Sequence, residues 1–196
     1  MGAKGGMSMF FVLITVIGVA FLQVSGGAPQ ILDPKTDHDA YAVYATLLQP
    51  DPDGEGNMKP PILLQAETEG PPRCAEFLAG MSGEWAEVAN NFRRENSRVR
   101  LLQAGVPMRI EYRLVPRDEI LADDARLAAK DPRRSNAPRP GSIKYIAVSA
   151  VGFNAAKTKA LVYVRFRTAH FSDAVLMKEL KEGKWVTGPR SCGGGA

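Results

Sequence analysis

The sequence predicts an α+β fold in which an antiparallel C-terminal meander packs against two or three helices. Apolar residues recur at helical spacing in the first part of the chain, and they alternate with polar residues in the last third. The 196 residues are 45% hydrophobic and 23% charged, a composition that excludes collagen-like, coiled-coil and fully disordered chains. No internal repeat is visible, and we expect a single domain over residues 29–190, followed by a Gly-rich tail at 191–196.

The first 28 residues have the order of charge, apolar core and small residues that is typical of a secretory signal peptide. Lys4 precedes an apolar stretch over residues 9–22, and small residues close the segment. As a helix, an apolar core of about 15 residues spans about 22 Å, less than the roughly 30 Å of a bilayer's hydrocarbon layer. We therefore expect a signal peptide cleaved after Gly26 or Ala28, with an uncleaved membrane anchor or a buried core helix as the alternatives.

Helices are expected over residues 37–49, 83–96 and 118–130. In the first, Tyr41 and Tyr44 lie at helical spacing behind a Thr-x-x-Asp start. The second carries an apolar stripe, and its first turn holds acidic residues that the helix dipole favours. The third has helical composition and ends at a Pro-rich stretch that reads as an exposed loop.

Strands are expected wherever apolar residues alternate or form a short buried run. They cover residues 62–68, 108–115, 143–151, 159–169, 174–180 and 184–187. In the fourth of these strands, Val162 and Val164 face one way and Arg165 and Arg167 the other. A turn at Glu182–Gly183 separates the last two strands.

The two cysteines, Cys74 and Cys192, are candidates for a disulfide, because export places the chain in an oxidising compartment. The loop closed by the bond would contribute about 4–5 kcal/mol in the chain-entropy model. The alternative is two unrelated thiols. In the same region, we expect Trp185 to be buried under the helices as a lid on the curved sheet.

Three motifs carry a resemblance to known proteins. Ser-Ala-Val-Gly-Phe-Asn at 149–154, Ala-Leu-Val-Tyr-Val at 160–164 and Lys-Glu-Gly-Lys-Trp-Val at 181–186 resemble a group of uncharacterised exported bacterial proteins. Members of that group often carry a Cys-Gly pair after the second motif, where this chain has Arg165-Phe166-Arg167, so no disulfide role carries over. The closing Gly-Lys-Trp strand also looks like the last strand of cone-shaped cystatin and ketosteroid-isomerase folds. The resemblance implies a secreted or periplasmic location and brings no catalytic residues.

Candidate catalytic and metal-binding residues are few. His38 lies between Asp37 and Asp39, but one local triplet does not supply the converging ligands that a metal needs, and helix capping and the helix dipole explain the acids. A nucleophilic pair of Cys74 and His170 is conceivable, although no family signature surrounds the cysteine. We therefore expect no metal and no cofactor.

Glu67 and Glu69 could form a carboxylate pair for glycosidic chemistry, but acids two apart at a strand end are more often solvated. A basic run could contact phosphates or lipid headgroups; it is interpreted as a solvated helix face balanced by neighbouring glutamates. Its members are Arg93, Arg94, Arg98 and Arg100, and the same interpretation applies to Arg133, Arg134 and Arg139 in the Pro-rich loop.

The function expected from these residues is binding rather than chemistry. The formal charge of +4 is mild and interspersed, so no nucleic-acid partner is expected, and membrane contact is expected only through an uncleaved N-terminal segment. The partner would be a protein, a peptide or a small ligand. The alternative hypothesis is a small enzyme or ligand carrier of the cone-shaped type that uses a buried carboxylate in a pocket.

Overall fold

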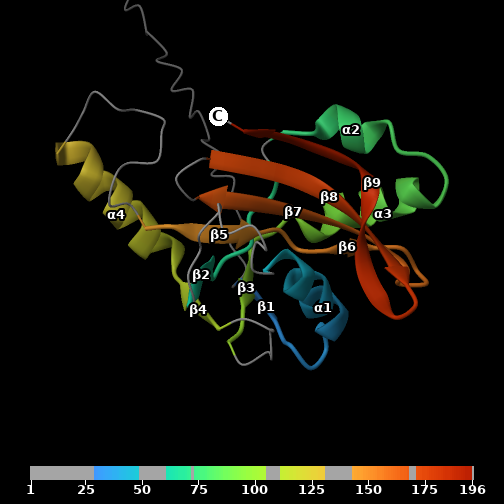
Figure 1. Cartoon of the computed structure of the whole chain (residues 1–196), viewed down its shortest axis with the longest axis horizontal. Coiled ribbons are helices and arrows are strands. Elements are labelled where there is room, and N and C mark those ends of the chain that lie inside the picture. The colour runs from blue at the N-terminus through green and yellow to red at the C-terminus, as the bar shows by residue number, and fades with distance from the viewer. Residues whose placement is uncertain are drawn as a thin grey trace, which may run out of the picture.

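In the computed structural model, a mixed β-sheet lies between helices that cover both of its faces (Figure 1). The structure describes residues 29–48, 61–71, 73–104, 111–130, 143–167 and 171–195. The expected signal peptide at 1–28 lies outside the described residues, as does the Pro-rich loop that carries Arg133, Arg134 and Arg139.

The described part of the chain contains four helices and nine strands. The helices are α1 (His38–Leu47), α2 (Ala75–Ala79), α3 (Glu84–Glu95) and α4 (Arg117–Lys130). The strands are β1 (Gln30–Leu32), β2 (Ile62–Gln65), β3 (Arg100–Leu102), β4 (Tyr112–Val115), β5 (Tyr145–Val148), β6 (Gly152–Phe153), β7 (Lys159–Arg167), β8 (Phe171–Lys181) and β9 (Lys184–Gly195). None of the helices in these ranges is both long and apolar enough to cross a membrane.

Each expected helix and strand overlaps one of these elements, and the predicted α+β class with a C-terminal meander is confirmed. The elements that the sequence did not predict are β1, α2, β3 and β6. Each has only two to five residues, too few to display a hydrophobic period.

The main sheet has the strand order β4-β2-β5-β7-β8-β9, with β6 paired to β7. From β5 to β9 the neighbours are antiparallel, as predicted. At the other end, β2 runs parallel to both β4 and β5, a difference from the expected antiparallel sheet. Parallel neighbours need crossover connections, and the helices between β2, β4 and β5 supply them. A separate two-stranded parallel sheet joins β1 to β3.

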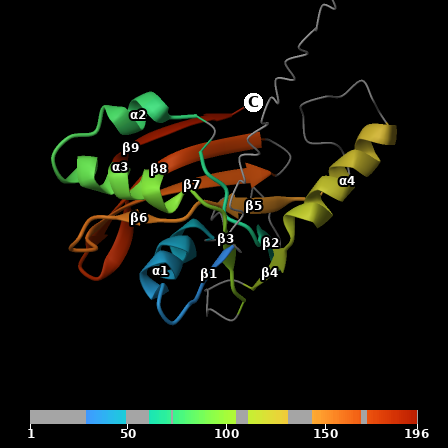
Figure 2. The same cartoon turned by 180° about the vertical axis from the view of Figure 1, so that it is seen from behind.

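The alternation predicted for β7 divides the core into two layers. Val162 and Val164 belong to one buried cluster with α1, whereas Leu161 and Tyr163 belong to another with α2 and α3. Figure 2 shows α2 and α3 over their face of β7 and β8. Strands β7 and β8 are thus covered on both faces.

The turn between β8 and β9 lies at Glu182–Gly183, as predicted. Their φ angles are 50° and 74°, the left-handed pair that a two-residue type I′ hairpin turn requires. Strand β9 then continues to Gly195 and pairs with β8 through residues 191–195. The expectation of a separate tail at 191–196 is therefore wrong for 191–195, because these residues complete a sheet edge through backbone hydrogen bonds.

Trp185 is half-buried rather than enclosed beneath the helices. Its ring lies 5.8 Å from that of Phe153, centroid to centroid. It is the second residue of the outermost strand and lies next to the turn, so neighbours pack on part of the indole only. The expectation of full burial is wrong for this reason.

Candidate functional site

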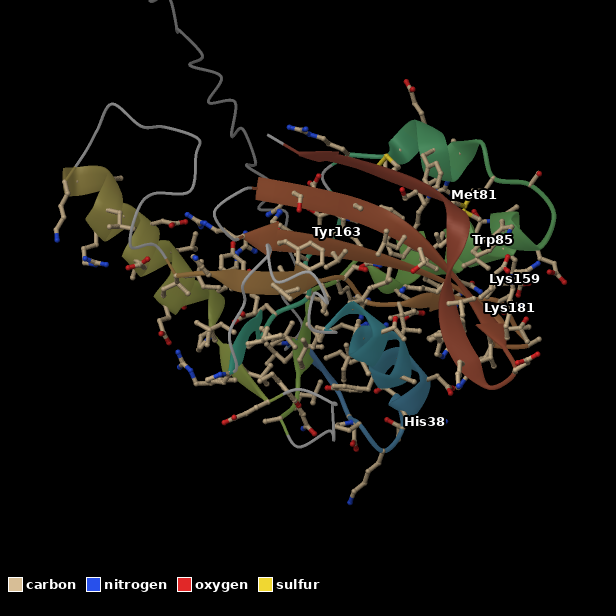
Figure 3. The ribbon with its side chains drawn as sticks, in the orientation of Figure 1. His38, Met81, Trp85, Lys159, Tyr163 and Lys181 are labelled. Carbon is tan, nitrogen blue, oxygen red and sulfur yellow. A yellow bond between two sulfur atoms is a disulfide. The ribbon has the colours of Figure 1, made fainter. Side chains whose placement is uncertain are left out.

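Cys74 and Cys192 form a disulfide, so the pairing that the sequence left open is present in the structure (Figure 3). Their Cα atoms are 5.9 Å apart, although 118 positions separate them in the sequence. The bond ties the residue before α2 to the last part of β9. Cys74 is therefore no free thiol for the conceivable pair with His170, which lies outside the described residues.

The acidic residues around His38 follow the expectation only in part: Asp39 lies in the first turn of α1, where the helix dipole favours an acid, but Asp37 does not cap the helix. The His38 side chain is 71% exposed, and its Nε2 lies 3.0 Å from Asp39 Oδ1. Asp37 precedes α1 but caps none of its backbone amides; its Oδ2 instead accepts hydrogen bonds from the Asp33 backbone nitrogen and the Thr36 hydroxyl. Capping is thus the wrong explanation for Asp37. Within the described ranges, no three His, Cys, Asp or Glu side chains are grouped to hold a metal.

Glu67 and Glu69 are also arranged differently from the expected solvated pair. Glu67 Oε2 accepts a hydrogen bond from the Arg117 backbone nitrogen at 2.8 Å. Glu69 forms an ion pair with Arg165, and both side chains are mostly buried. The two carboxylates therefore bind different elements and do not face one another across a cleft.

The basic run divides into two parts. Arg93 and Arg94 are exposed at the end of α3, which agrees with a solvated helix face, and Arg98 is exposed in the segment after that helix. Arg100 instead lies on β3 with a side chain only 15% exposed, and it forms an ion pair with Glu95. Glu95 is therefore the glutamate that balances Arg100, and this largely buried ion pair is not part of a solvated face.

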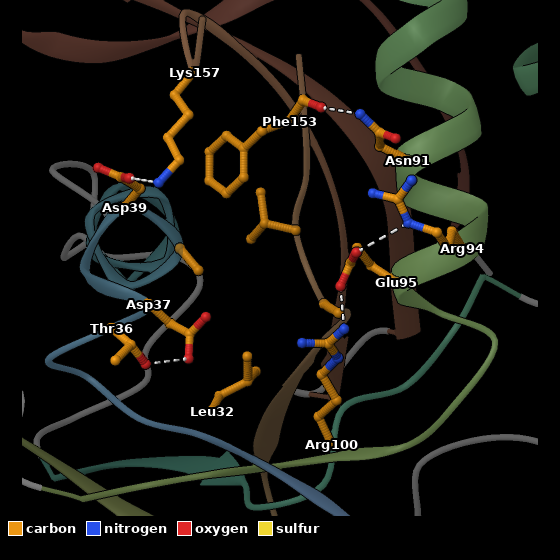
Figure 4. A pocket seen from close by; sticks show the side chains of 13 residues that line it. Leu32, Thr36, Asp37, Asp39, Asn91, Arg94, Glu95, Arg100, Phe153 and Lys157 are labelled. Atoms are coloured by element: carbon orange, nitrogen blue, oxygen red, sulfur yellow. Dashed lines mark hydrogen bonds and ion pairs between the residues drawn. The ribbon is translucent and has the colours of Figure 1, made fainter. Parts of the chain in front are cut away.

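These charges surround a pocket of about 220 Å³ between the start of α1 and α3, here called the α1–α3 pocket (Figure 4). Three stretches of chain supply its walls: 32–40, 91–100 and 150–157. The lining residues are Leu32, Thr36, Asp37, Asp39, Ala40, Asn91, Arg94, Glu95, Arg100, Ala150, Val151, Phe153 and Lys157.

Close packing of β6 on α3 fixes one wall of the pocket. A Cβ atom on Gly152 would lie 2.4 Å from the backbone of Phe92, so only glycine allows this approach. Asn91 Nδ2 donates to the Phe153 carbonyl at 2.7 Å, and Asn96 Nδ2 donates to the Ala150 carbonyl at 2.9 Å. The wall is thus held by hydrogen bonds on both sides of Gly152.

A buried tyrosine fixes the opposite wall. The Tyr44 hydroxyl on α1 donates to the Ser149 carbonyl at 2.8 Å, and its ring is fully buried. Burial raises the pKa of Tyr44 well above its ordinary value, so its hydroxyl remains a donor at any physiological pH. Both walls are therefore anchored to the segment that follows β5.

The charges in the pocket form pairs that cross between elements. Lys157 Nζ lies 2.6 Å from Asp39 Oδ2, which joins the loop after β6 to α1. Arg100 pairs with Glu95, whose Oε1 also lies 3.4 Å from Arg94 Nε. Arginine and carboxylate groups of this kind bind ionised ligands through charge-assisted hydrogen bonds.

A second, smaller cavity of about 90 Å³ lies beside the disulfide, and Tyr163 and Asp173 line it. The Tyr163 hydroxyl donates to Asp173 Oδ2 at 2.9 Å and accepts from Arg165 Nε at 3.0 Å. Burial is the main cause that raises the pKa of Tyr163, with a further contribution from its hydrogen bond to Asp173. The phenol is therefore a neutral donor inside a closed polar network.

Sequence reasoning singled out Asp37, Asp39, Arg94 and Arg100, but as separate acidic and basic clusters. It did not connect them to one pocket, and it gave Lys157 no role. Because the three contributing stretches are far apart in the sequence, periodicity carries no signal of their meeting.

Comparisons with models of protein families, with curated proteins and with solved structures find no match to this chain. The resemblance to exported bacterial proteins and to cone-shaped folds therefore stays a prediction, and the function has to be argued from the site.

Proposed function

We propose that this protein is exported and acts by binding a small soluble ligand, without covalent chemistry, in the α1–α3 pocket. The observation that carries the proposal is the pocket itself: charged groups of both signs stand around an apolar floor. In small-molecule sites, apolar surface binds the body of the ligand and polar groups fix its orientation, and this pocket offers both.

The lining groups favour recognition over catalysis. Asp39 and Glu95 are engaged in ion pairs with Lys157 and Arg100, which direct these carboxylates at their partners. The lining hydroxyl, that of Thr36, is bonded to Asp33 and Asp37. Groups held in this way are suited to orienting a ligand.

The alternative, an enzyme with a buried carboxylate, has one observation in its favour. Asp173 is 8% exposed and lines the cavity beside the disulfide. That cavity, however, has room for only a few water molecules at about 90 Å³, and the carboxylate already accepts the Tyr163 hydroxyl. These contacts support a structural role for Asp173.

Export is supported by the signal-like segment at 1–28 and by the disulfide, since such bonds persist mainly in oxidising compartments. The test is the intact mass of the protein recovered from a secreting host. We expect a chain that lacks its first 26 or so residues. A full-length mass in the membrane fraction would contradict a cleaved signal.

The binding proposal is tested with Thr36→Trp, which places an indole at the exposed rim of the pocket. Lys35→Trp is the matched control, because Lys35 is next to Thr36 in the sequence and is also exposed, but its side chain does not line the pocket. Ligand-observed NMR against mixtures of small metabolites should find binding to the native protein and to the Lys35→Trp variant, but not to Thr36→Trp.

Absence of any bound metabolite, or binding that Thr36→Trp leaves unchanged, would overturn the proposal. A turnover of hydrolase or isomerase substrates that is lost in Asp173→Asn would favour the enzyme alternative instead.

A further inference from the structure

The formal charges around the α1–α3 pocket cancel. Among the described residues of its lining, three are acidic and three are basic: Asp37, Asp39 and Glu95, and Arg94, Arg100 and Lys157. Charged side chains attract an ionised ligand when one sign is in excess, and here neither sign is. A ligand with a net charge would lose hydration without meeting an opposite excess in the site. The charge balance therefore favours an uncharged ligand.

Hydrogen-bonding capacity of both kinds remains on separate walls. Asp37 is bonded through Oδ2, and none of the described residues donates to its Oδ1. Arg94 and Arg100 each bind Glu95 through one nitrogen, and no residue in the described ranges accepts from their other terminal nitrogens. Figure 4 shows these side chains around the pocket, with Arg100 15% exposed on the inside and Arg94 70% exposed at the rim.

Hydroxyl groups match both kinds of wall. A hydroxyl donates one hydrogen bond and accepts two, so it can bind a carboxylate oxygen on one side of the pocket or a guanidinium on the other. A ring with a hydroxyl on most of its carbons presents such a group in every direction. Each contact is made separately, so the site needs no fixed separation between its acceptor wall and its donor wall.

The floor of the pocket suits the other surface of such a ring. Leu32 and Val151 are buried, and the half-buried ring of Phe153 is directed into the pocket (Figure 4). Phe153 also packs on Trp185, with 5.8 Å between the ring centroids, which holds the phenyl group in place. The C–H face of a sugar ring gains free energy against a surface of this kind, while its hydroxyls point to the walls.

The mouth of the pocket is built at a conformational cost. Lys157 lies in the turn between β6 and β7 with a φ of 52°, a left-handed conformation that glycine adopts without strain and lysine does not. Its Nζ lies 2.6 Å from Asp39 Oδ2. Strain of this kind is typical of functional sites. It indicates that the charge of Lys157, rather than the turn, determines which residue stands at this position.

The volume limits the size of the ligand. The pocket measures about 220 Å³, below the roughly 300–1,000 Å³ of sites that hold drug-sized molecules. One six-membered sugar ring fits this limit, whereas an oligosaccharide would extend beyond the walls.

We infer that the α1–α3 pocket binds one neutral monosaccharide, with its hydroxyls on Asp37, Arg100 and the rim residue Arg94. Its C–H face lies on the floor of Val151 and Phe153. This inference rests on the proposed function and names the ligand class of the same pocket. It also predicts discrimination by charge, because an amino sugar or a uronic acid adds a charge that the balanced lining does not compensate.

Saturation-transfer NMR titrations of the purified protein test the inference. The neutral probes are D-glucose, D-galactose and D-mannose, and each is compared with the amino sugar and the uronic acid of the same configuration. At least one neutral hexose should bind, and its two charged counterparts should bind about fivefold more weakly, the effect of one unit charge at about 4 Å in water. Cyclohexanol, a ring with a single hydroxyl, should not bind.

Two variants shift the charge balance in opposite directions. Lys157→Met leaves one negative charge in excess and should make the amino sugar the preferred ligand, whereas Asp39→Asn leaves one positive charge in excess and should favour the uronic acid. Both side chains reach solvent, at 55% and 26% exposure, so the fold should tolerate these changes. Arg93→Gln is the matched control, since Arg93 is exposed on α3, bonds to Asn90 and does not line the pocket; it should keep the preference for the neutral sugar.

Equal binding of neutral and charged sugars, or an unchanged preference in both Lys157→Met and Asp39→Asn, would overturn the inference. Hexose binding that survives Thr36→Trp would place the sugar outside the pocket and overturn it as well. If no hexose binds but Thr36→Trp abolishes binding of another small metabolite, the sugar inference fails and the proposed binding function stands. If no probe and no metabolite binds, both fail.

Discussion

The double variant Cys74→Ala/Cys192→Ala removes a cross-link between residues 118 positions apart. In the chain-entropy model, closing a loop of that length lowers the entropy of the unfolded chain by about 16 cal/mol/K, or about 5 kcal/mol at 25 °C. This equals the lower end of the roughly 5–15 kcal/mol that stabilises a typical domain. We therefore expect the variant to be partly unfolded or close to its unfolding transition at 37 °C.

The backbone at Cys74 allows a second measurement in the same experiment. Its φ is 78°, a left-handed conformation that costs a residue with a Cβ atom roughly 1–2 kcal/mol. Alanine keeps this strain and glycine relieves it, although glycine gives back roughly 0.5–1 kcal/mol through its greater unfolded-state entropy. Cys74→Gly/Cys192→Ala should therefore be more stable than the double-Ala variant by about 1 kcal/mol.

Urea unfolding of the oxidised protein and of both variants provides the free energies. The comparison must use extrapolated free energies rather than midpoints, because a cross-linked unfolded chain exposes less surface and has a smaller m-value. A loss below about 1 kcal/mol in the double-Ala variant would show that the disulfide does not close the long loop in solution. Equal stability of the Ala and Gly variants would refute the left-handed conformation at position 74.

Three further substitutions, two of them with a control variant, test the packing of the sheet and the lysine buried in it. Gly152→Ala should lower the free energy of unfolding by about 1–3 kcal/mol, since the added Cβ would meet the backbone of α3 at 2.4 Å. Gly70→Ala is the control: its Cβ would meet nothing closer than 3.8 Å, so the loss in the same urea titration should be less than about 1 kcal/mol. Trp185→Ala should cost about 2 kcal/mol, roughly half of the value for a fully buried aromatic, and an unchanged stability would place the indole in solvent. Burial lowers the pKa of Lys178 in the folded protein below its ordinary value of 10.5. Between the folded and the unfolded pKa of this lysine, the unfolded chain binds more protons, so the stability should rise with pH across that window. Lys178→Met should abolish this rise, whereas the exposed Lys181→Met should retain it; parallel slopes in all three proteins would contradict the assignment.

The sequence by itself determined the α+β class and the long elements. Helix α3 buries one face, and a buried face leaves a period that a short stretch of sequence displays. Strand β7 is buried on both faces, and its unbroken run of apolar residues is the local signal of such a strand. The turn at Glu182–Gly183 was predictable for a similar local reason, because two residues between strands require left-handed backbone that glycine supplies. The cysteine pairing was permitted by the sequence but not determined by it, since no local pattern measures the distance between Cys74 and Cys192.

Only the tertiary structure decided the parallel end of the sheet, the extent of β9 and the α1–α3 pocket. Residues 191–195 include three glycines, which show no side-chain pattern, and backbone pairing with β8 makes them a strand. The pocket depends on contacts such as Asp39 with Lys157, 118 positions apart. Ion pairs of this kind are set by which helix packs beside which strand, and that arrangement follows from burial of the whole core rather than from any segment alone.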